Sequence, residues 1–563
     1  MATVSRTGKR MWVLKRLPLG VKFTLFVAAT AHCLFSWIGF NPTDDGFFLA
    51  HSRRILEGQI PHLNFISVRP PLTALLHIPV VALGGDYTYW LSRGVVWLEF
   101  AAIAWAWVAI AQKLRQLRLL DRDKTWLALV VFIFTAHTFP PMVWNSVDGL
   151  LCVSLGLYLL IGQKTPWVKA AGYLILGLAP LTRQNFALLL PLTLIVTGDW
   201  RRPAYWLCAV APATAFVLYL GFVGGLSAAS EQLFAHTELA QTGFFVYLHG
   251  LRGMAAWVGV VLGAAAGRLR PTARYRAQAA SALAYGALAA GTAGLWFNLF
   301  PQAAFLLFGV AVGYVVTDLL NRQRDANWLR LEVLIVAVAW SVSISNGYNT
   351  PALAGGILLI VPLLGLLEAS VDRQHAPASA WKPRVVVLGA ALAVFAYGRL
   401  AFPCSGMAPP RDAPAWELTS DLGEVWPGGH LIRTSTGTYR FLEDLERAVA
   451  VAGASRYAIV PDCPGYWAVV GGDPLPVPWP QTGELPTQRL VDVVTRAIEL
   501  QKGQLVVLVE KTDPREVYRN PTGAPRPASG IPYVPIWQVQ PVASYCLQHL
   551  SLVAETKYFW ILR

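Results

Sequence analysis

The sequence has few charged residues for its length, and this scarcity excludes an ordinary soluble protein. Only 14% of the 563 residues are Asp, Glu, Lys or Arg, whereas 55% are hydrophobic. The C-terminal part also lacks a Walker loop, a nucleophile elbow and any spaced set of Cys and His residues typical of zinc sites. These absences leave no motif for nucleotide binding, serine hydrolysis or structural zinc in that part.

Long apolar runs are what the sequence has instead. Runs of about 17–22 residues recur from the N-terminus to about residue 401, and this length crosses the hydrocarbon core of a membrane. We therefore predict a polytopic α-helical membrane protein with about thirteen transmembrane helices. Ala29-Thr30-Ala31 resembles a signal-peptide cleavage site, but the apolar run continues beyond it, so we expect an uncleaved anchor. The predicted spans are 23–40, 88–111, 126–138, 147–162, 168–181, 186–198, 204–224, 251–266, 279–297, 301–319, 331–345, 352–368 and 385–401.

Lysine and arginine are distributed unevenly between the predicted loops. With a cytoplasmic N-terminus, the inner loops hold most of them, and the short outer loops hold only Arg53, Arg54, Arg69 and Arg183. By the positive-inside rule, the loop 41–87 and the C-terminal region then lie outside the cytoplasm. The net charge of +14 is therefore a signal of membrane topology, with anionic lipid headgroups as its partner, and we expect no nucleic-acid partner.

The residues after 401 lose the apolar runs and gain proline, glycine and charge. We therefore expect a transmembrane domain at 1–401 and an exported domain at 402–563. Helical spacing at 438–453 and 486–503, with apolar runs at 457–463 and 504–511, predicts a small mixed α/β fold. At most one disulfide can form in this domain, and three unpaired buried thiols fit equally well; its cysteines are Cys404, Cys463 and Cys546.

The loop 41–87 carries the first candidate site. Asp44 and Asp45 directly follow the first predicted span, and Arg69 precedes two prolines. A carboxylate can accept a proton from an attacking hydroxyl, and arginine can hold phosphate oxygens in a bidentate fork. The pattern fits a reaction that needs a base and releases a phosphate. The alternative is structural, because either aspartate could instead cap a helix beginning at Gly46.

Further polar residues lie at the predicted outer ends of later spans, and polar groups at a membrane boundary are often functional. Arg183 is a second candidate phosphate contact, although it could simply extend from the end of a span towards the headgroups. His236 and His249 could be ordinary loop histidines. The candidate substrate-binding residues are Gln184, Asn185, Glu231, His236, His249, Asn346, Tyr348 and Asn349.

These motifs resemble those of the GT-C superfamily of integral-membrane glycosyltransferases. The similarity is to the bacterial branch with the lipid A aminoarabinose transferase, the core galacturonate transferases and relatives of protein O-mannosyltransferases. It covers most of residues 20–400, and Arg69 and Arg183 stand where that family has lysine. The segments that carry it are Asp44-Asp45, RRILEGQIP (53–61), Arg69-Pro70, GLAPLTRQNFALLLP (177–191), EQLFAHTELAQTGFFVYL (231–248) and SNGYNTPALAGGILLIVPLL (345–364).

The resemblance implies an inverting glycosyltransferase at the outer face of a bacterial inner membrane. Asp44, with Asp45 as the second choice, would be the base, and Arg69 and Arg183 would hold the donor phosphate. The implied partners are a polyprenyl-phosphate sugar donor and an envelope acceptor, which is lipid A or lipopolysaccharide, a cell-wall glycan or a protein. No cofactor or metal ligand set is expected, although the sequence does not exclude a divalent metal ion.

Two other classes remain open at the level of sequence. A lipid-linked sugar transporter or flippase would also carry charges in the membrane, but it would be expected to show repeated halves with broken helices, and no internal repeat is evident. A non-catalytic scaffold for envelope assembly would tolerate replacement of Asp44 and Arg183.

Overall fold

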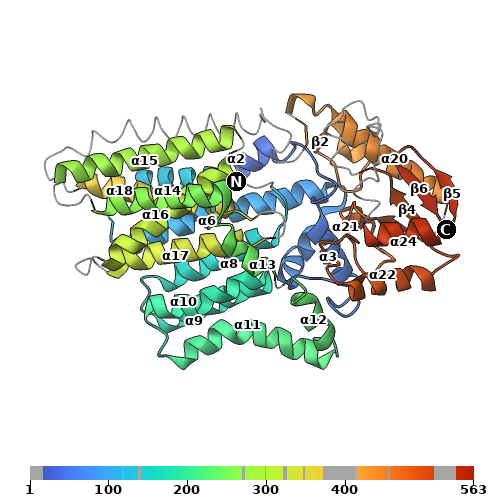
Figure 1. Cartoon of the computed structure of the whole chain (residues 1–563), viewed down its shortest axis with the longest axis horizontal. Helices are drawn as coiled ribbons and strands as arrows, with labels where there is room; N and C mark the ends of the chain where they lie inside the picture. The colour runs from blue at the N-terminus through green and yellow to red at the C-terminus, as the bar shows by residue number, and fades with distance from the viewer. Residues whose placement is uncertain are drawn as a thin grey trace, which may run out of the picture.

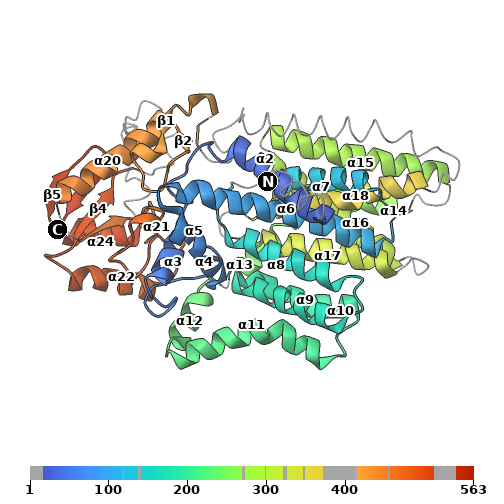
Figure 2. The same cartoon turned by 180° about the vertical axis from the view of Figure 1, so that it is seen from behind.

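The protein is described from a computed structural model. It covers residues 17–563 except 118, 137–140, 237, 269–272, 298, 321–325, 346–348, 372–411, 414, 454–455 and 513–539. A bundle of long helices forms one end of the molecule and an α/β region forms the other, with the short helices of the first loop between them (Figure 1). The view from behind shows the same order (Figure 2).

The bundle is built from apolar helices that follow the predicted spans. Four stretches are long and apolar enough to cross a membrane within the described residues: Leu72–Leu114, Pro203–Phe222, Gly250–Arg268 and Phe300–Leu320. Every predicted span up to 352–368 overlaps a helix, the span 385–401 lies outside the described residues, and the total of thirteen stays a prediction. The helices are α2 (Leu19–Phe35), α6 (Thr88–Leu114), α7 (Asp121–Ala136), α8 (Asn145–Leu160), α9 (Pro166–Leu178), α10 (Leu189–Thr197), α11 (Pro203–Phe222), α14 (Gly250–Arg268), α15 (Ala273–Trp296), α16 (Phe300–Leu320), α17 (Ala326–Ser343) and α18 (Gly355–Val371).

Small residues let two of these helices pack backbone to backbone. A Cβ atom on Gly263 of α14 would lie 2.3 Å from the Val310 carbonyl oxygen of α16. Likewise, a Cβ atom on Gly309 would lie 1.9 Å from the Ala256 carbonyl oxygen. Because helices in lipid gain little from the hydrophobic effect, such close approach is a principal source of their association.

The C-terminal region folds around one mixed four-stranded sheet. The strands are β3 (Tyr457–Val460), β4 (Val506–Glu510), β5 (Leu552–Glu555) and β6 (Phe559–Leu562), in the order β3-β4-β6-β5. β3 and β4 pair in parallel, and β4, β6 and β5 pair antiparallel. The helices beside the sheet are α20 (Thr436–Ala452), α22 (Gln488–Leu500) and α24 (Pro541–His549), whereas β1 (Ser420–Asp421) and β2 (Arg433–Thr434) form a separate two-stranded ribbon.

The predicted α/β fold of this region agrees with the structure at α20, β3, α22 and β4. No pattern in the sequence predicts β5, β6 or α24. Cys463 and Cys546 are both free and buried, so they do not pair with each other. Cys404 lies outside the described residues.

The C-terminal region packs directly on the first loop, which folds into α3 (Phe47–Leu56), α4 (Leu72–Leu76) and α5 (Ile78–Gly84). Arg54 of α3 forms a buried ion pair with Asp473 and also donates to the Leu475 carbonyl. The Ile66 amide donates to the Pro476 carbonyl at 2.7 Å. The main hydrophobic cluster is continuous from the bundle through the loop into the C-terminal region, so it crosses the expected boundary at residue 401.

The Arg54–Asp473 pair should therefore be essential to how the two regions hold together. We expect Arg54→Ala to lower the free energy of unfolding by about 3–5 kcal/mol, because Asp473 would remain buried without its counter-charge. Unfolding by denaturant in mixed micelles, followed by tryptophan fluorescence, measures this loss. Arg53→Ala is the matched control: Arg53 pairs with Glu57 at the surface, so the loss should be at most about 1 kcal/mol. Equal losses for the two variants would contradict the structural role of the buried pair.

Candidate active site

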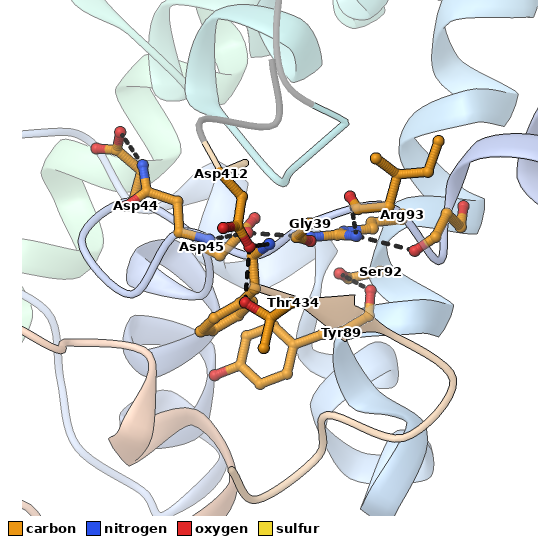
Figure 3. A network of polar contacts seen from close by, with 12 residues as sticks. Gly39, Asp44, Asp45, Tyr89, Ser92, Arg93, Asp412 and Thr434 are labelled. Atoms are coloured by element: carbon orange, nitrogen blue, oxygen red, sulfur yellow. Dashed lines mark hydrogen bonds and ion pairs between the residues drawn. The ribbon is translucent and has the colours of Figure 1, made fainter. Parts of the chain in front are cut away.

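The candidate site begins where the chain leaves α2 and wraps around a buried arginine. Arg93 of α6 donates to the carbonyl oxygens of Ser36, Ile38 and Gly39 at 2.8, 3.2 and 2.7 Å. It also forms an ion pair with Asp45 at 3.1 Å (Figure 3). Because the guanidinium is planar and carries five donors, one side chain can hold the whole turn from 36 to 45. The position of the acidic pair therefore depends on Arg93.

Asp45 is occupied by this arrangement. Its Oδ2 accepts from Arg93 and from the Asn41 amide, the latter at 3.0 Å. Burial raises the pKa of the Asp45 carboxyl, and the Arg93 guanidinium and the Asn41 amide oppose that rise. A carboxylate held in this way supports the loop, because its Oδ2 already accepts two hydrogen bonds.

Asp44 is placed differently from its neighbour. Its Oδ2 accepts from Asn41 Nδ2 at 3.1 Å, and its carboxylate points away from Arg93 (Figure 3). Neither aspartate is the N-cap of the next helix, because Gly46 holds that position in α3, with φ at 88°. The capping alternative is therefore wrong. The structure therefore places the two predicted catalytic residues differently, and the choice of Asp44 as the base stays a prediction.

The C-terminal region contributes two more acids to this turn. Asp412 accepts from the Phe40 amide at 2.9 Å and from Thr434 Oγ1 at 2.6 Å, and burial raises the pKa of its carboxyl. Asp462 Oδ2 accepts from Thr43 Oγ1 at 2.8 Å. The sequence patterns single out neither Asp412 nor Arg93 as a functional residue. No local pattern marks them, since their partners are far away in the chain.

Arg69 lies beside the start of α3. Its guanidinium is 5.2 Å from the Phe47 ring and 5.9 Å from the Phe48 ring. The same guanidinium donates to both carboxylate oxygens of Glu484 in the C-terminal region, at 2.5 and 2.6 Å. The charge of Arg69 is therefore already balanced by Glu484, a partner that the sequence analysis did not foresee.

Arg183, by contrast, has no carboxylate partner among the described residues. It donates to Ser146 Oγ in the first turn of α8. Burial and the nearby charge of Arg69 lower the pKa of Arg183 to about 9, which leaves it cationic at neutral pH. A cation without a counter-charge at the N-terminus of a sixteen-residue helix is a favourable place for an anion.

Aromatic side chains connect the start of α8, near Arg183, to the turn that bears Asp44. Trp144, which precedes α8, packs against Phe48 at 5.4 Å and Phe47 at 6.3 Å between ring centroids. Phe47 begins α3, two residues after Asp45. The start of α8 and the start of α3 are therefore in contact, with Arg69 over the same two rings.

The candidate substrate-binding residues contact other loops. Gln184 and Asn185 donate to the carbonyls of Leu233 and Ile344, and His236 contacts the Gly483 carbonyl at 3.0 Å. The remaining described candidates are Glu231, which pairs with Arg489 at 3.3 Å, His249, which stacks on Phe245, and Asn349, which accepts from the Ser345 amide. Asn346 and Tyr348 lie outside the described residues. These contacts brace the loops around the site, and a role in binding substrate stays a prediction.

Within the described residues, one group of side chains has the make-up of a metal site. His77, Glu99 and Asp148, the last in the first turn of α8, bring potential ligand atoms to within 4.8 Å of one another. No metal ligand set is expected from the sequence, because nothing in the spacing of these three residues links them.

Comparison with known proteins found similarity to solved structures. No family model matches, and no curated protein matches. The structure aligns with the crystal structure of ArnT from Cupriavidus metallidurans bound to undecaprenyl phosphate, at 14% identity over 99% of this chain and 98% of that chain, with a TM-score of 0.40. The apo form of the same protein aligns at 14% identity over the same shares, with a TM-score of 0.35.

Acid should destabilise the first loop through His51 of α3. Burial, with the nearby charges of Arg54 and Arg69, holds the pKa of this imidazole well below its usual value of about 6.5. The unfolded chain therefore binds a proton below about pH 6.5 that the folded chain does not, so stability falls as the pH drops through that value, by up to about 1.4 kcal/mol per pH unit. Denaturant unfolding at pH 7.5, 6.5 and 5.5 measures the slope.

His51→Phe should flatten this acid slope, because the ring site is already lined by Phe47 and Phe65. A control variant at the exposed His549, His549→Phe, should keep the wild-type slope. An unchanged slope in His51→Phe would show that other groups cause the acid sensitivity.

Proposed function

We propose that this protein is an inverting glycosyltransferase that moves a sugar from a polyprenyl-phosphate donor to a hydroxyl group of an envelope acceptor. The reaction would take place at the outer face of a bacterial inner membrane. The observation that carries the proposal is the division of labour in the site. Asp45 is held by Arg93, Asp44 is the carboxylate that would act as the base, and Arg183 offers a positive charge at the N-terminus of α8 that no described carboxylate balances.

The chemistry follows from these two sides of the site. The Asp44 carboxylate accepts the proton of the acceptor hydroxyl while that oxygen forms a bond to the anomeric carbon of the sugar. The bond between the anomeric carbon and the phosphate oxygen breaks, and its electron pair leaves with the polyprenyl phosphate. A base of this kind contributes about 10²–10⁴-fold in rate. Attack from the face opposite the phosphate inverts the anomeric centre.

The cations act on the leaving group. Arg183 and the first amides of α8 face the charge that develops on the phosphate, and such preorganised donors are often the largest contribution to catalysis. Arg69 supplies the second positive charge once the donor phosphate competes with Glu484 for its guanidinium. Two guanidiniums suit this task because each can grip phosphate oxygens in a fork.

The cellular side of the reaction follows from the distribution of charge. The positive-inside pattern supports a cytoplasmic N-terminus, with the first loop and the C-terminal region outside. On that side the donor would be lipid-linked, and the acceptor would be lipid A or another lipopolysaccharide, a cell-wall glycan or a protein. Mass spectrometry of envelope glycolipids and glycoproteins, with and without the gene, would identify both the sugar and the acceptor.

The role of Asp44 predicts a specific pattern of loss. We expect Asp44→Asn to lower transfer by at least about 100-fold with the fold intact, because the amide cannot accept the proton. Complementation of a gene deletion, read out as the glycosylated envelope product by mass spectrometry, measures the loss. Asp45→Asn is the comparison: it weakens the Arg93 pair and should lower stability more than Asp44→Asn does. Normal product from a well-expressed double variant, Asp44→Asn with Asp45→Asn, would refute the mechanism.

The role of Arg183 predicts a loss of anion affinity. We expect Arg183→Gln to weaken binding of undecaprenyl phosphate by about tenfold or more, because it removes a hydrogen bond to a charged group worth about 1.5–3 kcal/mol. Thermal shift of the purified protein, titrated with undecaprenyl phosphate in detergent, measures the affinity. Arg201→Gln is the control, since Arg201 is exposed and lies over Trp200. Equal affinities for wild type and Arg183→Gln would place the phosphate elsewhere.

A further inference from the structure

Three side chains that the proposed transfer does not use meet inside the helical bundle. His77 lies at the junction of α4 and α5, Glu99 lies in α6, and Asp148 lies in the first turn of α8. His77 Nε2 and Asp148 Oδ1 are 3.1 Å apart, and one ligand atom from each residue lies within 4.8 Å of the others. All three residues are buried, at 1%, 7% and 0% exposure.

With both carboxyl groups ionised, the charges of this group are not balanced by the described side chains around it. Two carboxyl groups face each other, and among the described residues the one basic group in contact with them is His77. The second oxygen of Asp148, Oδ2, is buried and has no hydrogen-bond partner in the described residues. Two adjacent carboxylates out of water repel each other strongly, so either protons or a bound cation must neutralise them.

The surrounding helices hold the three ligands in place. The His77 amide donates to the Thr73 carbonyl at 3.3 Å, and the His77 carbonyl accepts from the Val80 amide at 3.1 Å, which fixes the backbone between α4 and α5. Lower in the bundle, α6 and α8 are joined by a hydrogen bond from Trp107 Nε1 to Ser154 Oγ at 2.9 Å. The group is therefore built on packed helices, which present ligands more rigidly than loops do.

We propose that His77, Glu99 and Asp148 form a binding site for one divalent transition-metal ion, Zn²⁺ or Mn²⁺. Zinc binds imidazole nitrogen and carboxylate oxygen at about 2.0–2.2 Å, so its ligand atoms lie close to the spacing of Nε2 and Oδ1 here. An imidazole ligand favours a transition metal over Mg²⁺ and Ca²⁺, which prefer oxygen ligands throughout. One ion would neutralise both carboxylates, and chelation by both oxygens of Asp148 would also engage its otherwise unpartnered Oδ2.

The ion would position the anion-binding end of α8. Asp148 is two residues from Ser146, the hydroxyl that receives the Arg183 hydrogen bond. Tying Asp148 to α6 and to the α4–α5 junction would fix the first turn of α8 and with it the Ser146 hydroxyl. Metal binding is nevertheless independent of the proposed transfer, because it follows from the three ligands alone.

Metal content tests the proposal directly. The full-length protein is purified in detergent, stripped with a chelator, incubated with ZnCl₂, MnCl₂ or MgCl₂, desalted and analysed by inductively coupled plasma mass spectrometry. We expect about one Zn²⁺ or Mn²⁺ per chain, no retained Mg²⁺, and an about tenfold or greater loss of retained metal in the double variant Glu99→Gln with Asp148→Asn. Asp199→Asn is the matched control, because Asp199 is a buried acid that pairs with Lys169 away from the group.

Equal metal content in the wild type and the double variant would overturn the site. So would absence of retained Zn²⁺ and Mn²⁺ from the reconstituted wild type, which would mean that protons neutralise the carboxylates. If the double variant fails to fold, pulsed electron paramagnetic resonance of Mn²⁺ in the wild type decides the question. A nitrogen coupling from one imidazole supports His77 as a ligand, and bound Mn²⁺ without any nitrogen coupling contradicts it.

Discussion

The candidate site depends on the hydrogen bonds and the ion pair that the buried guanidinium of Arg93 makes. It donates hydrogen bonds to three buried backbone carbonyl oxygens and forms an ion pair with one buried carboxylate. A turn of polar backbone directly after an apolar helix would otherwise be costly to bury, since each unsatisfied group loses its bond to water. Arg93 lies on α6, so the turn is held in place by the longest helix among the described residues and not by another loop. The acidic pair inherits that rigidity.

The same turn also joins the two ends of the molecule. Residues of the C-terminal region contact it through Asp412 and Asp462, and they contact the rest of the first loop through Asp473, Pro476 and Glu484. These contacts combine ion pairs, backbone hydrogen bonds and a shared hydrophobic cluster. The C-terminal region is thus part of the wall around the first loop, and its charges set the electrostatic environment of the site.

Local patterns in the sequence were sufficient for the helices of the bundle and for four elements of the C-terminal fold, because apolar length and helical spacing are local properties. They also singled out Asp44, Asp45, Arg69 and Arg183. The structure puts Arg69 over the Phe47 ring and its charge near Arg183, and the roles of all four residues stay predictions. The local patterns could not separate the roles of the two aspartates, because that distinction depends on Arg93, about fifty residues further along the chain. The sequence also did not predict Glu484, Asp412 or the group of His77, Glu99 and Asp148. The reason is the same, because the partners of these residues are distant in the sequence and come close only in the folded protein.

The pairing of Arg69 with Glu484 has a consequence for turnover. A lipid phosphate that leaves a sugar gains negative charge, so a site strong enough to stabilise it at the moment of bond breaking also tends to retain it afterwards. The Glu484 carboxylate can pair with the Arg69 guanidinium again as the phosphate departs. The spent lipid would then leave Arg69 without exposing an uncompensated charge. Under the proposed function, Glu484 would limit product inhibition, and the C-terminal region would take part in resetting the site between cycles.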